Sequence, residues 1–211
     1  MRTKLFGGFV AALAIAAFAV LPAAASAAPA TIRSRTSTIV ATSGNLTFTS
    51  SGGQIACTES ELTGEITGEG QITLNNEGTF EGGGTMEAGG VELCPDNGTG
   101  GRVEASVRHV AFTPLNLRTG NPITGNIANA GFEIALWDRN IIPNAPIAEC
   151  RYEGEVNTTT EPRTDEINIA GQVAGLAASR GPLSICPEAG ELNGDFRVQD
   201  TATPPMPVIF H

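Results

Sequence analysis

The stretch LCPDNG, Leu93 to Gly98, returns 92 residues later as ICPEAG, Ile185 to Gly190. In both copies an apolar residue, a cysteine and a proline precede an acidic residue and, two positions on, a glycine. The repetition predicts a duplicated scaffold, with pseudo-repeats over about 36–118 and 124–201.

The N-terminus determines how the cysteines in these phrases are interpreted. Arg2 and Lys4 precede an almost wholly apolar run over residues 5–21, and small residues follow up to Ala27. A short basic region, an apolar run and a small-residue cleavage site are typical of a secretory signal peptide. We therefore expect residues 1–27 to be removed, and the mature protein to be secreted without an integral membrane segment.

The chain has four cysteines, Cys57, Cys94, Cys150 and Cys186. An even number of cysteines in an exported chain indicates disulfides, whereas zinc sites favour close C-x-x-C pairs, which this sequence lacks. QIAC ends at the first cysteine and PIAEC at the third, and a Cys-Pro pair follows 37 or 36 residues later. Each pseudo-repeat thus carries its own pair, and we predict the disulfides Cys57 with Cys94 and Cys150 with Cys186.

Apolar and polar residues alternate with a period of two between the cysteines. Ile72 and Leu74, for example, alternate with Thr73 and Asn75. This period indicates strands with one buried face, and clusters of Gly and Asn between the strands supply turns. Many short strands with regular turns predict an all-β domain over 36–201, an antiparallel β-sandwich built from the two pseudo-repeats, each with one disulfide.

The ends of the mature chain and one internal strand have features of their own. Residues 28–35 are polar or small, which predicts a flexible N-terminal segment, and residues 202–211 form a Pro-rich C-terminal tail. The apolar phase changes at Arg108 and His109, which predicts a β-bulge there.

The mature chain is strongly acidic. All 22 acidic residues lie after Ala27, and the ten arginines that remain leave a net charge of −12. Such a chain would be repelled by nucleic acid and by anionic membranes. We expect no nucleic-acid partner, and instead an extracellular or cell-wall ligand of unknown identity.

Few residues could support catalysis or hold a metal. The only histidines are His109 and His211, no serine has the context of a catalytic nucleophile, and the thiols are expected to be oxidised. The sequence Asp96-Asn97-Gly98 is foremost a turn signal, with calcium binding as its alternative. We predict no catalytic residue, no metal site and no cofactor.

Carboxylates are the one abundant reactive group. A glycosidase needs two of them facing each other across a cleft, and the candidates are Glu81, Glu87, Glu133 and Asp138. Acidic residues at alternate positions are also expected on the solvated face of a sheet, so paired carboxylates are an alternative interpretation.

Trp137 is the single tryptophan, and Asp138 and Arg139 follow it. Sugar-binding modules of β type present exposed aromatic residues, so these three residues form a candidate binding site. The other interpretation of Trp137 is a core tryptophan on a strand covered on both sides. Tyr152 is the only other large amphipathic aromatic residue.

The run IACTESELTGEITG from Ile55, with a second cysteine some 36 residues on and twofold repetition, resembles exported, disulfide-bonded all-β proteins of high-GC bacteria. The resemblance covers 36–201 and implies a β-sandwich and export, without carrying over any site residue. We therefore expect an exported, acidic, non-catalytic structural or binding protein. The alternative is a carbohydrate-binding or carbohydrate-active protein that uses paired carboxylates.

Overall fold

The computed structural model describes residues 27–75, 78–88, 91–99, 102–112, 114–138, 140, 145–180 and 186–211. The predicted signal peptide before Ala27, and Arg139 of the candidate binding site, lie outside the described residues. Apart from the short 3-10 turn η1 (Asn97–Thr99), the regular structure of this part of the chain is β-strand. No helix found in it has the length and apolar character needed to cross a membrane.

The strands follow the predicted alternation. They are β1 (Ile32–Arg33), β2 (Thr38–Ser43), β3 (Leu46–Ser50), β4 (Gly53–Cys57), β5 (Glu59–Gly68), β6 (Gln71–Leu74), β7 (Thr79–Glu81), β8 (Glu87–Ala88), β9 (Val91–Glu92), β10 (Cys94–Pro95), β11 (Val103–Phe112), β12 (Leu115–Arg118), β13 (Ile123–Asp138), β14 (Ala148–Thr160), β15 (Glu166–Arg180), β16 (Ala189–Asp200) and β17 (Ile209–Phe210). In β14, Tyr152 and Val156 are buried whereas Arg151 and Glu153 are exposed, because successive side chains point to opposite faces of a strand.

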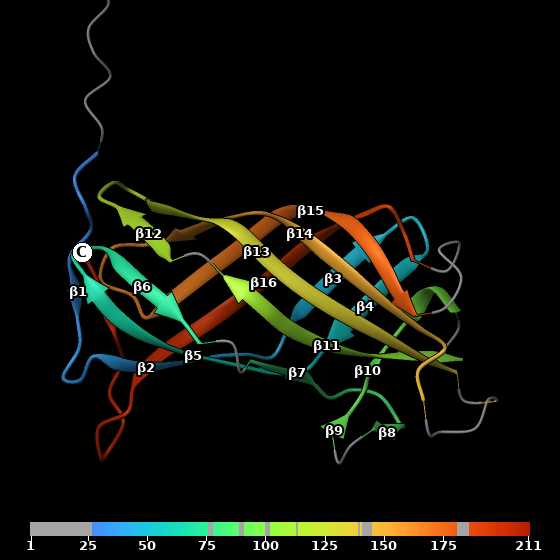
Figure 1. Cartoon of the computed structure of the whole chain (residues 1–211). Helices are drawn as coiled ribbons and strands as arrows, with labels where there is room; N and C mark the ends of the chain where they lie inside the picture. The colour runs from blue at the N-terminus through green and yellow to red at the C-terminus, as the bar shows by residue number, and fades with distance from the viewer. Residues whose placement is uncertain are drawn as a thin grey trace, which may run out of the picture.

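The strands form a closed, eight-stranded barrel, in which short strands that continue one another count as one barrel strand (Figure 1). Each barrel strand pairs antiparallel with the next one along the chain. Four barrel strands are the long strands β13, β14, β15 and β16. The other four are assembled from shorter strands that continue one another: β2 with β3, β4 with β5, β6 with β7 and β10, and β11 with β12. Because β16 pairs with both β2 and β3, the last barrel strand pairs with the first, and the barrel is closed.

The predicted sandwich is therefore wrong in its architecture, whereas the all-β, antiparallel, disulfide-bonded character of the domain is confirmed. Sandwiches and barrels both bury one face of each strand, so they produce the same alternation in sequence. They differ in whether the first and last strands pair, and that pairing leaves no trace in the period. The twofold repetition stays a prediction from the sequence.

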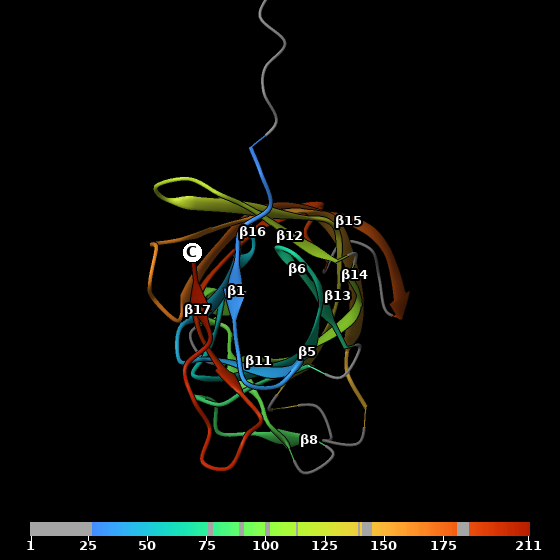
Figure 2. The ribbon, with the colours of Figure 1, turned by 90° about the vertical axis from the view of Figure 1, so that its left-hand side faces the viewer.

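Both halves of the chain contribute to one core. Seen along the barrel, the strands surround a common interior (Figure 2). Two aromatic contacts join the halves across it: the ring centroids of Phe48 and Tyr152 are 4.8 Å apart, and those of Phe80 and Phe132 are 6.3 Å apart. Such ring pairs stabilise a core beyond the area they bury.

The two disulfides are the predicted ones, Cys57 with Cys94 and Cys150 with Cys186. The first joins β4 to β10, where the wall of the barrel is otherwise held by one isolated bridge between Ile55 and Asp96. It thus fastens a seam that lacks a continuous hydrogen-bonded ladder. Both bonds are compatible with an oxidising, extracellular environment.

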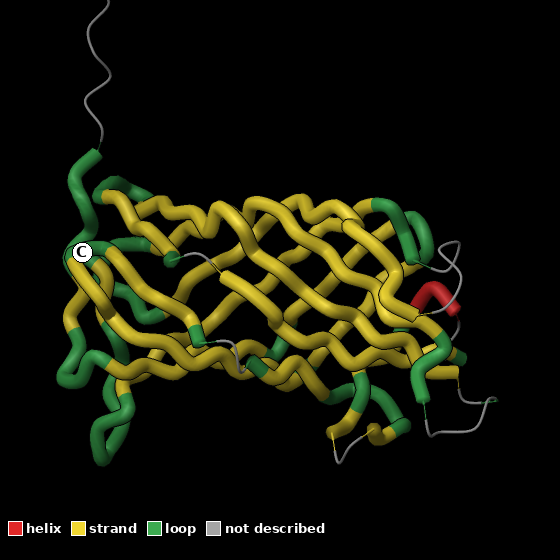
Figure 3. Tube along the Cα trace, viewed as in Figure 1, coloured by secondary structure: helices red, strands yellow, loops and turns green. Residues whose placement is uncertain are grey.

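The first strand, β1, and the last strand, β17, lie side by side. β1 pairs antiparallel with β17, with Ile32 opposite Phe210. Ala30, Val208 and Phe210 are fully buried in the core, so the paired ends cover one end of the barrel. Figure 2 shows β1 and β17 in front of that end, and Figure 3 shows loops gathered at both ends of the strands.

The predicted β-bulge in β11 is present. Its pairing with β13 shifts register between His109 and Ala111, within one residue of the position that the sequence indicated.

Candidate functional site

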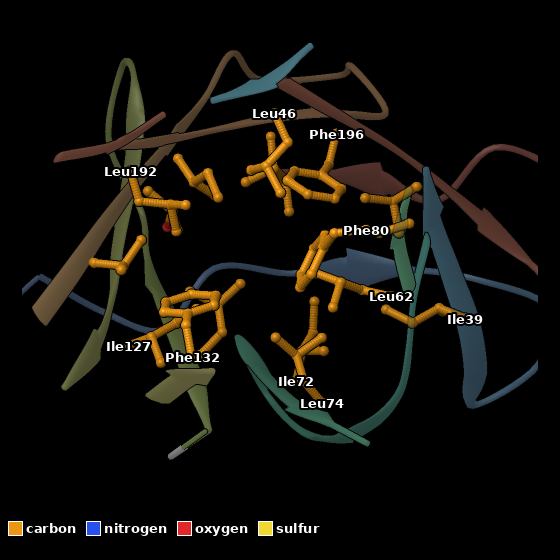
Figure 4. A pocket seen from close by; sticks show the side chains of 17 residues that line it. Ile39, Leu46, Leu62, Ile72, Leu74, Phe80, Ile127, Phe132, Leu192 and Phe196 are labelled. Atoms are coloured by element: carbon orange, nitrogen blue, oxygen red, sulfur yellow. The ribbon is translucent and has the colours of Figure 1, made fainter. Parts of the chain in front are cut away.

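The barrel interior holds two cavities that follow each other along the strands. The first, which we call the central cavity, has a volume of about 50 Å³. Side chains from strands all around the barrel point into it, among them Leu46, Phe80 and Phe132 (Figure 4). Its lining is apolar except for Thr158, which is 2% exposed and whose hydroxyl has no hydrogen-bond partner.

The second cavity, which we call the end pocket, lies at the barrel end remote from the paired termini and has a volume of about 140 Å³. Its walls are mostly apolar and come from β3, β4, β13 and β14, with Phe48, Ile134 and Leu136 as examples. Three polar side chains, those of Ser50, Asp96 and Tyr152, also line it. A concave apolar site with a few convergent polar groups is the usual form of a small-molecule pocket.

Both copies of the repeated phrase reach the end pocket. Asp96 of LCPDNG and Pro187 of ICPEAG line it on either side of the turn between β3 and β4. The turn fits there because it contains glycine: a Cβ on Gly53 would lie 2.6 Å from Oδ1 of Asp96. In the same region a Cβ on Gly190 would lie 2.2 Å from the Phe48 ring, so the second phrase leaves space for that ring.

The two titratable groups of the end pocket are desolvated. Burial raises the pKa of the Asp96 carboxyl, although a hydrogen bond from the backbone N–H of Gly98 (2.9 Å) opposes the shift. The same hydrogen bond makes the predicted turn at Asp96-Asn97-Gly98. Burial also raises the pKa of Tyr152 to about 12, so its hydroxyl is neutral at physiological pH.

Tyr152 is the most distinctive group in the pocket. Its side chain is 1% exposed, and its hydroxyl makes no hydrogen bond with the residues that the structure describes. Buried polar groups in proteins are nearly always paired, because an unpaired one costs about 1–3 kcal/mol. The Tyr152 hydroxyl is therefore available to a molecule in the pocket.

The candidate residues Trp137 and Asp138 lie elsewhere. Trp137 follows Leu136, which faces the end pocket, so its side chain points to the outer face of β13, directly opposite Glu104 of β11. The indole is half-buried, and its N–H is buried without a hydrogen-bond partner in the described part of the chain. Asp138 is buried and forms an ion pair with Arg102 at 2.8 Å.

The ion pair predicts a pH dependence of stability. Hydrogen bonds from Arg102 and from the backbone N–H of Asn140 hold the pKa of Asp138 below its ordinary value. The ionised carboxylate thus stabilises the fold above the unfolded-state pKa of about 3.9, and the contribution disappears as the pH falls through the lower folded-state pKa. We expect Asp138→Asn to lower the urea midpoint at pH 7 and to leave it near that of the wild type below pH 3. An equal loss at both pH values would contradict this role.

The candidate carboxylates for glycoside hydrolysis do not meet inside the barrel. Glu133 forms an ion pair with Arg108 at 2.7 Å, and Glu87 lies in the short outer strand β8. Glu81 lies directly opposite Glu59 in the pairing of β7 with β5. Together with Glu61 they line an open outer groove of about 520 Å³, which is where the paired-carboxylate alternative has to be placed.

The described part of the chain contains no cluster of metal-ligating side chains. No group of three or more histidine, cysteine, aspartate or glutamate side chains there is arranged to hold an ion.

Comparisons of the chain with protein-family models, with curated proteins and with solved structures found no match. The geometry of the interior therefore has to carry any functional conclusion.

Sequence reasoning missed the end pocket although one signal for it was present. Tyr152 has the same phase along β14 as Cys150 and Val156, which both face inward. That phase indicates an inward tyrosine, whereas Trp137 is out of phase with Phe132 and Leu136. The position of Asp96 beside the same pocket has no such signal, because it depends on closure of the barrel.

Proposed function

We propose that the protein is an exported, non-catalytic binding protein whose end pocket takes a small, largely apolar molecule with one hydrogen-bonding group. The observation that carries the proposal is the neutral, unpartnered hydroxyl of Tyr152 in an apolar pocket of about 140 Å³. Small barrels of eight strands can hold one small ligand, and an apolar protein cavity of about 150 Å³ can hold a molecule the size of benzene.

The charges around the pocket favour neutral or cationic ligands. Asp96 supplies a desolvated carboxylate that can accept a hydrogen bond, and the mature chain carries a net charge of −12 from its 22 acidic residues and ten arginines. An anionic ligand would be repelled by both. An alcohol or an amine could donate to Asp96 and pair with Tyr152.

The end pocket supports this function better than the outer groove supports glycoside hydrolysis. Glu59 and Glu61 are exposed side chains on the wet face of the sheet, where water screens carboxylates. The pocket instead combines concavity, apolar walls and desolvated polar groups.

The test is binding of n-butanol to the mature protein, followed by NMR at several alcohol concentrations. We expect Tyr152→Phe to weaken binding about three- to tenfold, since it removes one hydrogen bond and keeps the ring. Trp137→Phe is the matched control on the outer face, and we expect it to leave the affinity unchanged. Binding that Tyr152→Phe does not alter, or the absence of any binding, would refute the proposed function.

A further inference from the structure

The two cavities of the interior lie in series. Along β13, Ile127 and Phe132 line the central cavity, and Ile134 and Leu136 line the end pocket. Along β3, Leu46 faces the central cavity and Phe48 the end pocket.

In β14 the end pocket is lined by Tyr152 and the central cavity by Val156 and Thr158. Tyr152 and Thr158 are six residues apart, which is about 20 Å along a strand. The central cavity therefore lies deeper along this strand than the end pocket.

Aromatic side chains lie where the linings of the two cavities adjoin. Phe132 lines the central cavity, Tyr152 lines the end pocket, and the two residues are directly opposite each other in the pairing of β13 with β14. Phe48 contacts the Tyr152 ring and Phe80 contacts the Phe132 ring. A side chain that turns about its own bonds can open such a division without any change in the strands, because rotamer changes are local.

We propose that the end pocket and the central cavity together bind one single-chain amphiphile, a linear primary alcohol or amine. Its polar head lies beside Tyr152 and Asp96, and its alkyl chain passes between the rings of Phe48, Tyr152, Phe80 and Phe132 into the central cavity. This inference rests on the proposed function of the end pocket.

The geometry fixes the orientation and the shape of the ligand. The central cavity offers one polar group, the Thr158 hydroxyl, among apolar side chains, whereas the end pocket offers Asp96 and Tyr152. The paired termini cover the opposite end of the barrel, with Phe210 fully buried, so the chain has to come in from the end pocket. A compact ring could fill the end pocket but could not reach both cavities.

The test is a homologous series of n-propanol, n-butanol, n-pentanol and n-hexanol, measured by calorimetric titration of the mature protein. Each buried methylene strengthens binding roughly fourfold, and we expect this gain to continue through n-hexanol, which the two cavities can hold together. If the gain stops once the end pocket is filled, so that n-hexanol binds no tighter than n-butanol, the inference is wrong while the proposed function stands. If no alcohol of the series binds, the proposed function itself fails.

A variant that fills the central cavity separates the two cavities. Ala41 lines the central cavity, and we expect Ala41→Leu to abolish the advantage of n-hexanol over n-butanol while leaving n-butanol binding unchanged. Ala170→Leu on the exposed face of β15 is the matched control and should change neither affinity. If Ala41→Leu fails to fold by circular dichroism, Ala41→Val replaces it with a smaller addition. Unchanged n-hexanol binding in a folded Ala41 variant would overturn the inference.

Discussion

Replacing Cys57 and Cys94 together with alanine is expected to lower the free energy of unfolding by about 4 kcal/mol and to weaken n-butanol binding. On the chain-entropy model, a crosslink that closes a loop of 37 residues contributes about that much by restricting the unfolded chain. The bond also fastens β4 to β10, where the isolated bridge between Ile55 and Asp96 is the other pairing. Opening this seam would displace Asp96 from the end pocket.

The second disulfide is the control for the first. Cys150→Ala with Cys186→Ala opens a loop of nearly the same size, 36 residues, so the stability loss should be similar. Cys150 lies in β14, however, which is laddered to β13 and β15, so the wall around it should stay closed. Urea unfolding and n-butanol titration of both variants check the expectation. A Cys57/Cys94 variant that loses less than about 1 kcal/mol and binds normally would contradict the role of the seam.

Glu104→Ala is expected to destabilise the protein by about 2–5 kcal/mol. Glu104 is fully buried on the outer face of β11, and its carboxylate accepts hydrogen bonds from the backbone N–H groups of Thr85 and Met86 at 2.7–3.0 Å. It also accepts one from the Thr85 hydroxyl at 3.0 Å. Removing the carboxylate leaves these donors without an acceptor, at about 1–3 kcal/mol for each that stays buried.

The loss should be concentrated in the segment that carries β8 and β9, because Glu104 accepts the hydrogen bonds from Thr85 and Met86 and so helps to hold them against the barrel. Amide hydrogen exchange should therefore increase at residues 84–86 more than in β14. Glu87→Ala is the matched control: it removes an exposed carboxylate from the same segment, and we expect a change within about 0.5 kcal/mol. Equal destabilisation by both substitutions would show that the buried carboxylate has no special role.

The sequence allowed the local features of the fold to be predicted because local chemistry determines them. The period of two placed the strands, the shift of phase at Arg108 and His109 placed the bulge, and Asp96-Asn97-Gly98 placed a turn. The repeated Cys-Pro phrase gave the disulfide pairing because each half carries a matching pair. These predictions needed no knowledge of which strands are neighbours.

Closure of the barrel and the end pocket could not be predicted from the sequence, because both depend on pairing between strands that are far apart in the chain. β16 pairs with β2, from opposite ends of the chain, and the alternation of either strand is the same whether that pair forms or not. The pocket in turn brings together Phe48, Asp96 and Tyr152, which no spacing in the sequence connects. The outward position of Trp137, by contrast, follows from its phase relative to Phe132, Ile134 and Leu136.

A ligand site inside the barrel beside Tyr152 can be tested with the two unique aromatic residues of the chain. The protein contains one tyrosine and one tryptophan, so the ring protons of each can be recognised in NMR spectra without further assignment. The decisive measurement is the set of nuclear Overhauser effects between bound n-butanol and aromatic protons of the mature protein. The proposed site requires effects from the alkyl protons to the Tyr152 ring and none to the Trp137 indole. Effects confined to Trp137, or absent from both rings, would contradict it.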